Sequence, residues 1–509
     1  MSRRRVPKEP FQIHEDDPTD LSDVETEESQ TQRAEDLEAE AEAEAEAEAE
    51  AEADEAQQQL EEEEDQENQE EDEPLDEEEG CESDSSDGSE PVDFTVQQDM
   101  EKLNFTFPAF KDNYRLIKRI GEGTFSTVYK AEDVRYDRYN NSWDLDARDS
   151  QWEAPPPLKT SSNSRSNSRS NPARKPRKFV AIKKIYVTSS PTRIFNELEL
   201  LHDLRDSPSV CPLITAFRHS DQVLAILPYF RHQDFRKYYP NMTVPDIKLY
   251  FRSLFTALAA VHEKGILHRD IKPTNFLYDP DKQRGVLVDF GLAEREGVDH
   301  KPCLCHLDQE SRRQKIRATY AMNASHAGPQ PGYPKNDTRP SRRANRAGTR
   351  GFRAPEVLFK CTEQTTKIDI WSAGVILLTI LCKRFPFFNS TDDVEAMIEI
   401  ATIFGVKRMR QAGQLHGCVF ETNIPSIGAQ GFSFEKIMLW STCRSDGSKD
   451  SKSELTDEEK GAVEFLGRCM DLDPSRRISA EEALSHKFLQ IDSEGEAEAE
   501  GSEEDVMMV

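Results

Sequence analysis

Residues 268 to 275 read His268-Arg269-Asp270-Ile271-Lys272-Pro273-Thr274-Asn275, and Asp289-Phe290-Gly291 begins fourteen residues after Asn275. The two segments supply two carboxylates and one amide in a fixed order. A carboxylate can accept a proton from a substrate hydroxyl, whereas an amide oxygen and a second carboxylate are suitable ligands for Mg²⁺. Asp270, Asn275 and Asp289 are therefore candidates for these two tasks.

This order of residues resembles the catalytic motifs of eukaryotic protein kinases, because five of the eight positions from 268 to 275 match an ordered template. Lys272 lies two residues after Asp270, as in serine/threonine kinases, whereas tyrosine kinases usually carry Ala or Arg nearby in a different arrangement. The resemblance implies that Asp270 accepts the proton of the substrate hydroxyl, that Asn275 and Asp289 hold Mg²⁺, and that Lys272 neutralises the transferring phosphoryl group. His268 and Phe290 are expected to be packing residues.

A glycine-rich segment, Gly121-Glu122-Gly123-Thr124-Phe125-Ser126-Thr127-Val128, precedes the strand-like run that ends at Lys183. The first two glycines would let the backbone approach a nucleotide, and Ser126 stands where a third glycine is usual. In isolation a plain hairpin turn would be the better interpretation, but the position of Lys183 favours a phosphate-covering loop. The residues expected to bind ATP are Ile120, Gly121, Glu122, Gly123, Thr124, Phe125, Ser126, Thr127, Val128, Lys183 and Phe230.

Lys183 needs an acidic partner if it is to contact phosphates in a partly buried cleft. Glu197 is the predicted partner, because it shares a helix face with Ile194 and Leu201, whereas Glu199 falls on the exposed side. The alternative for Glu197 is an ordinary surface carboxylate. We count Asp270, Lys272, Lys183 and Glu197 as the catalytic set.

Other residues are expected to act as scaffold. Ala354-Pro355-Glu356 would close the activation segment, and Arg477 stands where kinases keep an arginine that pairs with that glutamate. Asp369 heads an apolar helix and is expected to bond the backbone of the catalytic loop.

The periodicity of apolar residues predicts an α+β, bilobal kinase fold, with a small β-rich N-lobe followed by a larger helical C-lobe. Order is expected to begin near Tyr114. The predicted strands lie around residues 114–129 and 180–183, and the predicted helices are Arg193 to Leu204, Leu249 to His262, Ile368 to Cys382 and Asp457 to Met470.

Charge is very unevenly distributed along the chain. Residues 1–95 hold 40 Asp/Glu and 5 Lys/Arg, and residues 491–509 hold 8 acidic residues and no basic one. The segment between them has 60 basic and 49 acidic residues, a net charge of +11 within a chain of -32. We expect a disordered acidic region at 1–109, a kinase domain at 110–490 with inserts at about 136–178, 296–346 and 427–455, and a disordered acidic tail at 491–509.

Nine cysteines in no regular pattern indicate a reducing compartment, and no apolar run is long enough to span a membrane, so a soluble protein is expected. Cys303, Cys305 and His306 offer three soft ligands for zinc, but no fourth follows at a usual spacing. The sequence alone therefore favours a loop without metal, and a zinc site would need a ligand from elsewhere.

Asp289 lies 65 residues before Ala354, about twice the usual separation, and this long segment ends in Arg346-Ala347-Gly348-Thr349-Arg350-Gly351-Phe352-Arg353-Ala354-Pro355-Glu356. With the segments Tyr114-Arg115-Leu116-Ile117 and Ile226-Leu227-Pro228-Tyr229-Phe230 and the three inserts, residues 110–490 resemble the cell-division-cycle-seven kinases.

That resemblance implies a nuclear enzyme that phosphorylates subunits of the replicative MCM helicase at serines near acidic or phosphorylated residues. It also implies activation by a Dbf4-type regulatory subunit, so the isolated chain should have low activity. Arg350 and Arg353 could bind the acidic residue of the substrate, although solvated charge or a contact with the activation segment itself is as good an interpretation for Arg353. Arg269 would pair with a phosphate on the activation segment, or a bound partner could do that ordering instead.

Two alternatives remain open at this stage. One is another acid-directed kinase, similar to casein kinase II and without a replication role. The other is a pseudokinase scaffold, but this sequence has a suitable residue at every expected catalytic position, which argues against it. The basic clusters at 172–178 and 342–343 could serve nuclear import, contact DNA phosphates or only solvate an insert. Direct DNA binding is not expected, because no aromatic residues interleave with the basic ones.

Overall fold

The computed structural model describes residues 14–15, 93–123, 126–139, 141, 143–144, 177–186, 188–297, 303–318, 346–444 and 454–490. Apart from residues 14–15, the acidic N-terminal region up to residue 92 and the tail from 491, where disorder is expected, lie outside these residues. So do Thr124 and Phe125 of the glycine-rich loop and most of the basic clusters. The predictions made for those positions remain predictions.

The chain divides into two compact units. The smaller unit comprises Met1–Ile194 and Leu213–Tyr229, and the larger unit comprises Phe195–Pro212 and Phe230–Val509. This division matches the predicted change from a β-rich to a helical part of the chain.

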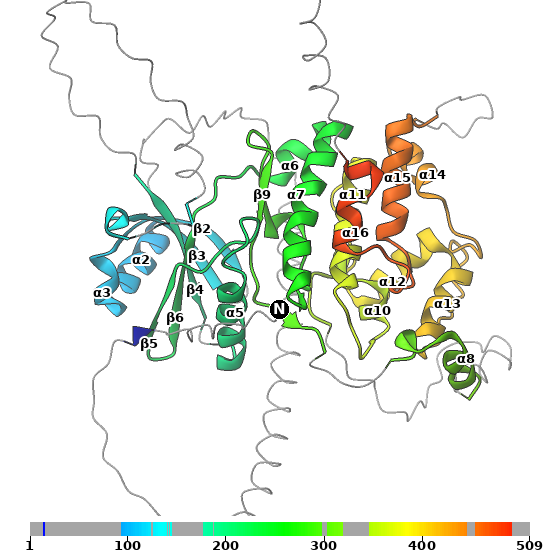
Figure 1. Cartoon of the computed structure of the whole chain (residues 1–509), viewed down its shortest axis with the longest axis horizontal. Coiled ribbons are helices and arrows are strands. Elements are labelled where there is room, and N and C mark those ends of the chain that lie inside the picture. The colour runs from blue at the N-terminus through cyan, green and yellow to red at the C-terminus, as the bar shows by residue number, and fades with distance from the viewer. Residues whose placement is uncertain are drawn as a thin grey trace, which may run out of the picture. The chain divides into compact units, whose positions relative to one another are not determined.

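The smaller unit is built on one six-stranded sheet with the strand order β1-β5-β6-β4-β3-β2 (Figure 1). All neighbouring strands are antiparallel except β1, which pairs with β5 in parallel. The strands are β1 (His14–Glu15), β2 (Tyr114–Gly123), β3 (Ser126–Asp133), β4 (Phe179–Ile185), β5 (Thr215–His219) and β6 (Gln222–Pro228).

Two helices lie between β1 and β2 in the chain, α2 (Phe94–Thr106) and α3 (Pro108–Lys111), and they correct the expectation that residues 1–109 are disordered. Leu103, Phe107 and Phe110 are fully buried and form one core cluster with β-strand residues such as Tyr129 and Ile182. Burying each such side chain stabilises the fold by about 1.5–3 kcal/mol, enough to hold a short helix on the sheet. The acidic composition of the preceding residues is the reason that the start of the folded part was predicted too late in the sequence.

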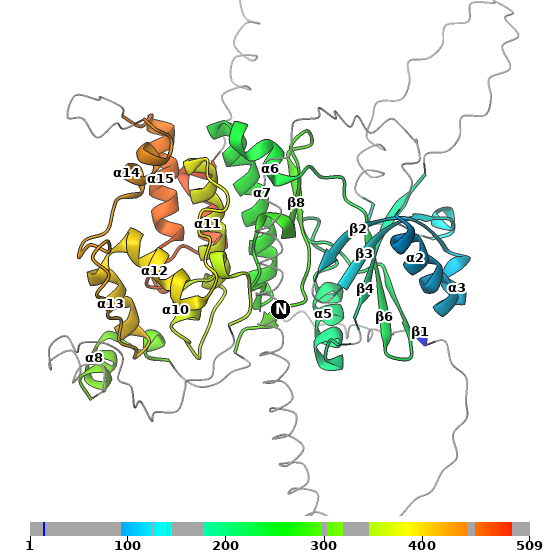
Figure 2. The same cartoon turned by 180° about the vertical axis from the view of Figure 1, so that it is seen from behind.

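The larger unit is mostly helical, and α11 (Lys367–Cys382) lies at its centre against α14 and α15 (Figure 2). Every residue of α11 from Ile368 to Cys382 is buried. Helix α5 (Pro191–Asp203) begins in the smaller unit and continues in the larger one from Phe195. The other helices are α6 (Phe235–Tyr238), α7 (Val244–Glu263), α8 (Gln309–Ala318), α10 (Pro355–Leu358), α12 (Asp393–Phe404), α13 (Val406–Leu415), α14 (Phe434–Ser441), α15 (Asp457–Cys469) and α16 (Ala480–Leu484).

Four short strands complete this unit. They form two ladders, β8 (Phe276–Asp279) with β9 (Arg284–Leu287) and β7 (Ile266–Leu267) with β10 (Glu294–Arg295). These ladders border the catalytic-loop motif and so fix where it begins and ends.

The four helices predicted from periodicity are confirmed as α5, α7, α11 and α15. The expected insert at about 427–455 is too wide, because it includes α14, whose Met438 is buried and which packs on α11 and α15. Among the described residues, no helix combines the length and the apolar character that a membrane span requires.

Candidate functional site

The catalytic-loop motif of the larger unit runs from the end of β7 to the start of β8. Asp369, at the start of α11, accepts hydrogen bonds from the backbone N–H groups of His268 (2.9 Å) and Arg269 (2.8 Å). Burial opposes ionisation of Asp369, but hydrogen bonds and charge from His262 and His268 outweigh it and lower the pKa of this carboxyl. The predicted scaffold role of Asp369 is confirmed, and the loop is anchored before the reactive residues begin.

Asp270 is buried and held from three sides. Asn275 Nδ2 donates to Asp270 Oδ2 at 2.9 Å, and Lys272 Nζ lies 3.1 Å from the same oxygen. Thr349 donates to Asp270 Oδ1 through its backbone N–H (3.1 Å) and its Oγ1 hydroxyl (2.7 Å). Both carboxylate oxygens are therefore fixed, so the orientation of this group is preorganised.

The same contacts control the ionisation of Asp270. Burial would raise its pKa, yet the Lys272 ammonium and the hydrogen bonds from Thr349 outweigh burial and lower the pKa below the ordinary value. Asp270 is thus a carboxylate at neutral pH. Lys272 Nζ also donates to Thr349 Oγ1 at 3.0 Å, so the three side chains form one network.

Thr349 belongs to the arginine-rich segment 346–356, and sequence reasoning gave it no role. Its neighbour Gly348 shows why the segment can approach so closely. Gly348 has φ of +105°, and a Cβ at this position would lie 2.3 Å from the carbonyl oxygen of Arg269. Only glycine accommodates both the left-handed backbone and this contact.

Asn275 and Asp289, the predicted Mg²⁺ ligands, lie on neighbouring backbone segments. The backbone N–H of Val288 donates to the carbonyl of Asn275 at 2.9 Å, which brings the residue before Asp289 to Asn275. Because Asn275 uses Nδ2 to bond Asp270, its side-chain oxygen is the atom that it can offer to a cation. Asp289 itself has a left-handed backbone with φ of 63°.

The end of the activation segment is fastened to the C-terminal part of the unit. Arg477 donates two hydrogen bonds to Glu356, at 2.6 and 3.0 Å, and both side chains are buried. This bidentate pair confirms the predicted scaffold contact.

Arg353 makes the contact that the sequence left as one alternative, because its Nε donates to Gly348 O at 2.6 Å. Its Nη1 also lies 2.8 Å from Asp393, and Arg346 reaches the other oxygen of Asp393 at 2.8 Å. Two guanidinium groups thus share one carboxylate beside the segment, which leaves a net positive charge there. Sequence reasoning named neither Arg346 nor Asp393 as a site residue.

In the smaller unit, the expected nucleotide loop joins β2 to β3. Gly121 pairs with Val128 and Gly123 with Ser126, on either side of Thr124 and Phe125, which are not described. A Cβ added at Gly121 or Gly123 would approach no other atom of the described chain closer than 3.8 Å. Packing within the described chain does not require these glycines. Lys183 lies in β4 opposite Val128 and is buried.

Glu197 lies on α5 with Ile194 and Leu201, all three buried, whereas Glu199 is exposed as expected. Helix α5 is tied to the segment after Asp289 at two points. Asn196 Nδ2 donates to the carbonyl of Ala293 at 2.8 Å, and Arg295 lies 2.6 Å from Asp203. The pairing of Glu197 with Lys183 remains a prediction.

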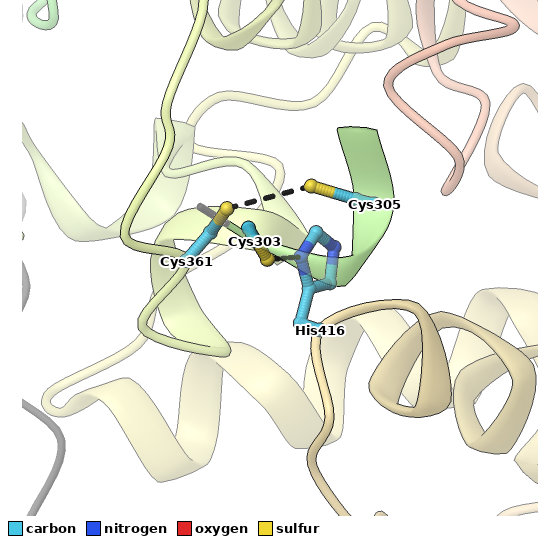
Figure 3. Close-up of side chains that lie close together, drawn as sticks. All are labelled: Cys303, Cys305, Cys361 and His416. Carbon is cyan, nitrogen blue, oxygen red and sulfur yellow. Dashed lines mark hydrogen bonds between the residues drawn. The ribbon is translucent and has the colours of Figure 1, made fainter. Parts of the chain in front are cut away.

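A second constellation lies at the start of the long insert. Cys303, Cys305, Cys361 and His416 are all buried and point toward one another, with their ligand atoms within 4.8 Å of each other (Figure 3). His306, which the sequence grouped with the two cysteines, lies outside this cluster and instead contacts the carbonyl of Glu363. The missing ligands come from positions 58 and 113 residues beyond Cys303, so no local spacing could indicate them.

The geometry of this cluster suits zinc. Cys305 Sγ lies 3.7 Å from Cys361 Sγ, and Cys303 Sγ lies 3.6 Å from His416 Nδ1. Zinc with Zn–S bonds of about 2.3 Å and Zn–N bonds of about 2.0 Å in tetrahedral geometry holds its ligands about 3.5–3.8 Å apart. Hydrogen bonds from Cys305 and Cys361 lower the pKa of the Cys303 thiol, whereas the hydrogen bonds with Cys303 and burial raise the pKa of the Cys305 and Cys361 thiols. A metal would therefore have to displace the protons of Cys305 and Cys361.

The turn that carries the two cysteines is itself braced. Arg312 of α8 donates to the carbonyl oxygens of Leu304 (3.1 Å), Cys305 (2.7 Å) and Leu307 (3.0 Å). The backbone N–H of Cys303 donates to Glu363 at 2.9 Å. A metal at this cluster would join the start of the insert to the segments around Cys361 and His416.

Comparison with known proteins agrees with this geometry. The family described as "Protein kinase domain" matches residues 168–311 and 332–489. The chain is 48% identical over 421 residues to the cell cycle serine/threonine-protein kinase hsk1 of Schizosaccharomyces pombe, covering 82% of this chain and 81% of that kinase. It is 40% identical to the cell cycle protein kinase spo4 of the same organism, covering 78% of this chain and 90% of spo4. A probable cell division control protein 7 homolog of Encephalitozoon cuniculi is 38% identical, with coverage of 77% and 95%.

Proposed function

The chain belongs to the cell-division-cycle-seven family of serine/threonine protein kinases, and on this premise we propose that it phosphorylates acidic serine sites of the replicative MCM helicase in the nucleus, with Mg²⁺-ATP and an activating Dbf4-type subunit. The observation that carries the catalytic part is the Asp270 carboxylate, fixed by Lys272, Asn275 and Thr349. The replication role rests on the cell cycle kinases that the chain resembles.

In the reaction, Asp270 orients the serine hydroxyl and takes up its proton as the serine oxygen bonds to the γ-phosphorus and the bond from that phosphorus to the β-phosphate oxygen breaks, releasing ADP. Its lowered pKa makes it a weak base, which suits a loose transition state in which the proton leaves late. Lys272 turns from Asp270 toward the γ-phosphoryl oxygens and neutralises their charge. The Thr349 hydroxyl keeps Asp270 in place while Lys272 is engaged with the nucleotide.

Asn275 and Asp289 hold Mg²⁺ in this proposal through one amide oxygen and one carboxylate, which are ligands that this hard cation prefers. Mg²⁺ held by these two residues would offset negative charge on the phosphates of ATP. In the smaller unit, Gly121 and Gly123 leave room for phosphates to approach the backbone, and Lys183 binds phosphates when Glu197 orients it.

Preference for acidic sites is supported by the arginines that border the segment between Thr349 and Glu356. Arg346 and Arg353 bring two positive charges to Asp393, so one positive charge remains for an acidic or phosphorylated residue next to the target serine. Because Asp393 already aligns both guanidinium groups, little side-chain entropy would be lost on binding. Arg350 lies in the same segment and adds a third positive charge.

Activation by a regulatory subunit is supported by the surface of α5. Phe195 is 53% exposed on this helix, two residues before the buried Glu197. A partner that covers Phe195 would hold the helix that carries Glu197, and so would favour the Lys183–Glu197 pair. The proposal predicts that Phe195→Ala weakens activation by the subunit and leaves the activity of the isolated chain unchanged.

One assay tests the substrate and the partner together. Peptides from acidic MCM tails, and the same peptides with the residue after the serine changed to Ala, are phosphorylated with and without the Dbf4-type subunit, with Asp270→Asn as the inactive control. We expect strong phosphorylation only of the acidic peptides and only with the subunit. Equal rates with and without the subunit would refute partner activation, and equal rates on both peptide sets would refute acidic preference. Phosphorylation of acidic casein peptides but not MCM peptides would favour the kinase similar to casein kinase II.

The proposal also assigns zinc to Cys303, Cys305, Cys361 and His416, on the strength of four converging ligand atoms. Metal analysis of the purified chain should find about one zinc ion per chain, as expected for a closed four-ligand site. Cys305→Ser should lose this zinc, whereas Cys418→Ser should keep it, because Cys418 lies nearby but bonds the Phe359 carbonyl instead. A chain purified without any zinc, or zinc retained by Cys305→Ser, would refute the assignment.

A further inference from the structure

Arg269 presents a charge that the catalytic steps above do not use. Its side chain is only 6% exposed, and its backbone is fixed by Asp369 with φ of 69°. A guanidinium group stays protonated in proteins, so a buried one needs a compensating charge and bonded donors. What compensates Arg269 therefore determines whether the catalytic loop keeps its shape.

The structure pairs Arg269 with Glu294. Arg269 Nη2 lies 2.5 Å from Glu294 Oε2, and Nη1 donates to Gln364 Oε1 at 3.1 Å. Glu294 lies in β10, where its backbone is in register with Leu267 of β7, two residues before Arg269. The ladder thus delivers the carboxylate to the guanidinium, independently of the long insert that follows.

Kinases that are switched on by phosphorylation use an arginine at this place in the loop to bind a phosphate on the activation segment. In this chain a carboxylate of the same segment already provides the negative charge. We infer that Glu294 is a positioning residue that replaces an activation-segment phosphate at Arg269, so that the catalytic loop is ordered without phosphorylation of this chain.

The neighbours of Glu294 extend the effect to α5. Ala293 accepts the hydrogen bond from Asn196, and Arg295 pairs with Asp203, so three consecutive residues link the catalytic loop to the helix that carries Glu197. Releasing Glu294 from Arg269 would loosen this link at its centre. The inference rests on kinase activity alone and not on the identity of the substrate or partner.

The test compares Glu294→Gln with Glu296→Gln in the full chain, co-expressed with its activating subunit and assayed on the peptide that the wild-type chain phosphorylates best. Glu296 is a matched control, because it is exposed two residues further along the same segment. Arg269→Gln and the Arg269→Gln/Glu294→Gln pair complete a double-mutant cycle. Wild-type protein is also assayed before and after complete dephosphorylation by a phosphatase, verified by mass spectrometry.

We expect Glu294→Gln, which removes the negative charge beside Arg269, to lower kcat by about 10- to 150-fold, the range expected when a hydrogen bond between charged groups loses one of its charges, with the KM for ATP nearly unchanged. Glu296→Gln should match wild type, the double variant should be no slower than Arg269→Gln, and dephosphorylation should leave the wild-type kcat unchanged. If Glu294→Gln lowers the Tm, Glu294→Asp serves as a second variant. Because it retains the negative charge, it should keep more activity than Glu294→Gln. Wild-type activity in Glu294→Gln, multiplicative effects in the double variant, or loss of wild-type activity on dephosphorylation would each overturn the inference.

Discussion

Replacing Thr349 with Val removes one hydroxyl from the catalytic network and leaves a side chain of nearly the same shape. The hydroxyl donates to Asp270 Oδ1 at 2.7 Å and accepts from Lys272 Nζ at 3.0 Å. When Lys272 engages the nucleotide, only the bond to Asp270 remains, and a hydrogen bond to a charged group contributes about 1.5–3 kcal/mol. If this energy holds Asp270 in its reactive orientation, kcat should fall by about 10- to 150-fold.

The variant should also change the dependence of the rate on pH. The hydrogen bonds from Thr349 help to lower the pKa of Asp270 against the effect of burial, so their partial loss should raise this pKa. Asp270 must be ionised to orient the hydroxyl, and the rate therefore falls as pH drops through its pKa. In Thr349→Val this acidic limb should lie at higher pH than in the wild type.

Both effects are measured by steady-state phosphorylation of a serine peptide over a range of pH, with saturating Mg²⁺-ATP. Thr349→Ser keeps the hydroxyl and serves as the matched control, with a rate and pH profile close to wild type. Thermal unfolding checks that the variants are folded. A Thr349→Val enzyme with the wild-type kcat, or with an unmoved acidic limb, would refute the role assigned to this hydroxyl.

Two further variants test the packing around the site. Gly348→Ala should lower kcat at least about tenfold, because its Cβ would lie 2.3 Å from the Arg269 carbonyl oxygen. The control is Gly467→Ala on α15, which should not change kcat, because a Cβ there meets nothing within 4 Å. Equal rates in these two variants would contradict this reasoning. Arg477→Met should lower the free energy of unfolding by about 3–5 kcal/mol, because it leaves the buried Glu356 carboxylate unpaired. Urea unfolding measures this loss, and an unchanged midpoint would contradict the structural role of the pair.

The parts of the site that sequence could predict are those in which chemistry depends on local spacing. Asp270, Lys272 and Asn275 lie within six residues, and the structure gathers them because a short loop cannot separate them. The Glu356–Arg477 pair was predictable only through resemblance, since the two residues are 121 positions apart.

Residues contributed by distant segments escaped the sequence analysis. Cys361 and His416 complete the cysteine cluster, yet nothing in their local sequence distinguishes them from ordinary core residues. Glu294 looked like one more charge after Asp289, and only the β7–β10 ladder brings it to Arg269.

The boundary of the folded part was also misjudged, for a different reason. Val96 and Leu103 of α2 and Phe107, which lies between α2 and α3, are buried, but they are few and adjoin a strongly acidic region. Composition averaged over that region outweighed a short helical pattern, although burial of a few large side chains is enough to fix two short helices on a sheet.

The central claim is that Asp270 is the carboxylate through which this chain transfers phosphate from ATP to serine. Single-turnover phosphorylation of an acidic serine peptide by wild-type and Asp270→Asn protein, each with the activating subunit, tests it most directly. We predict that Asp270→Asn keeps the wild-type Tm and ATP affinity while its rate falls by at least about 100-fold, the usual contribution of a positioned acid or base. A rate in Asp270→Asn within a few fold of wild type would contradict the account.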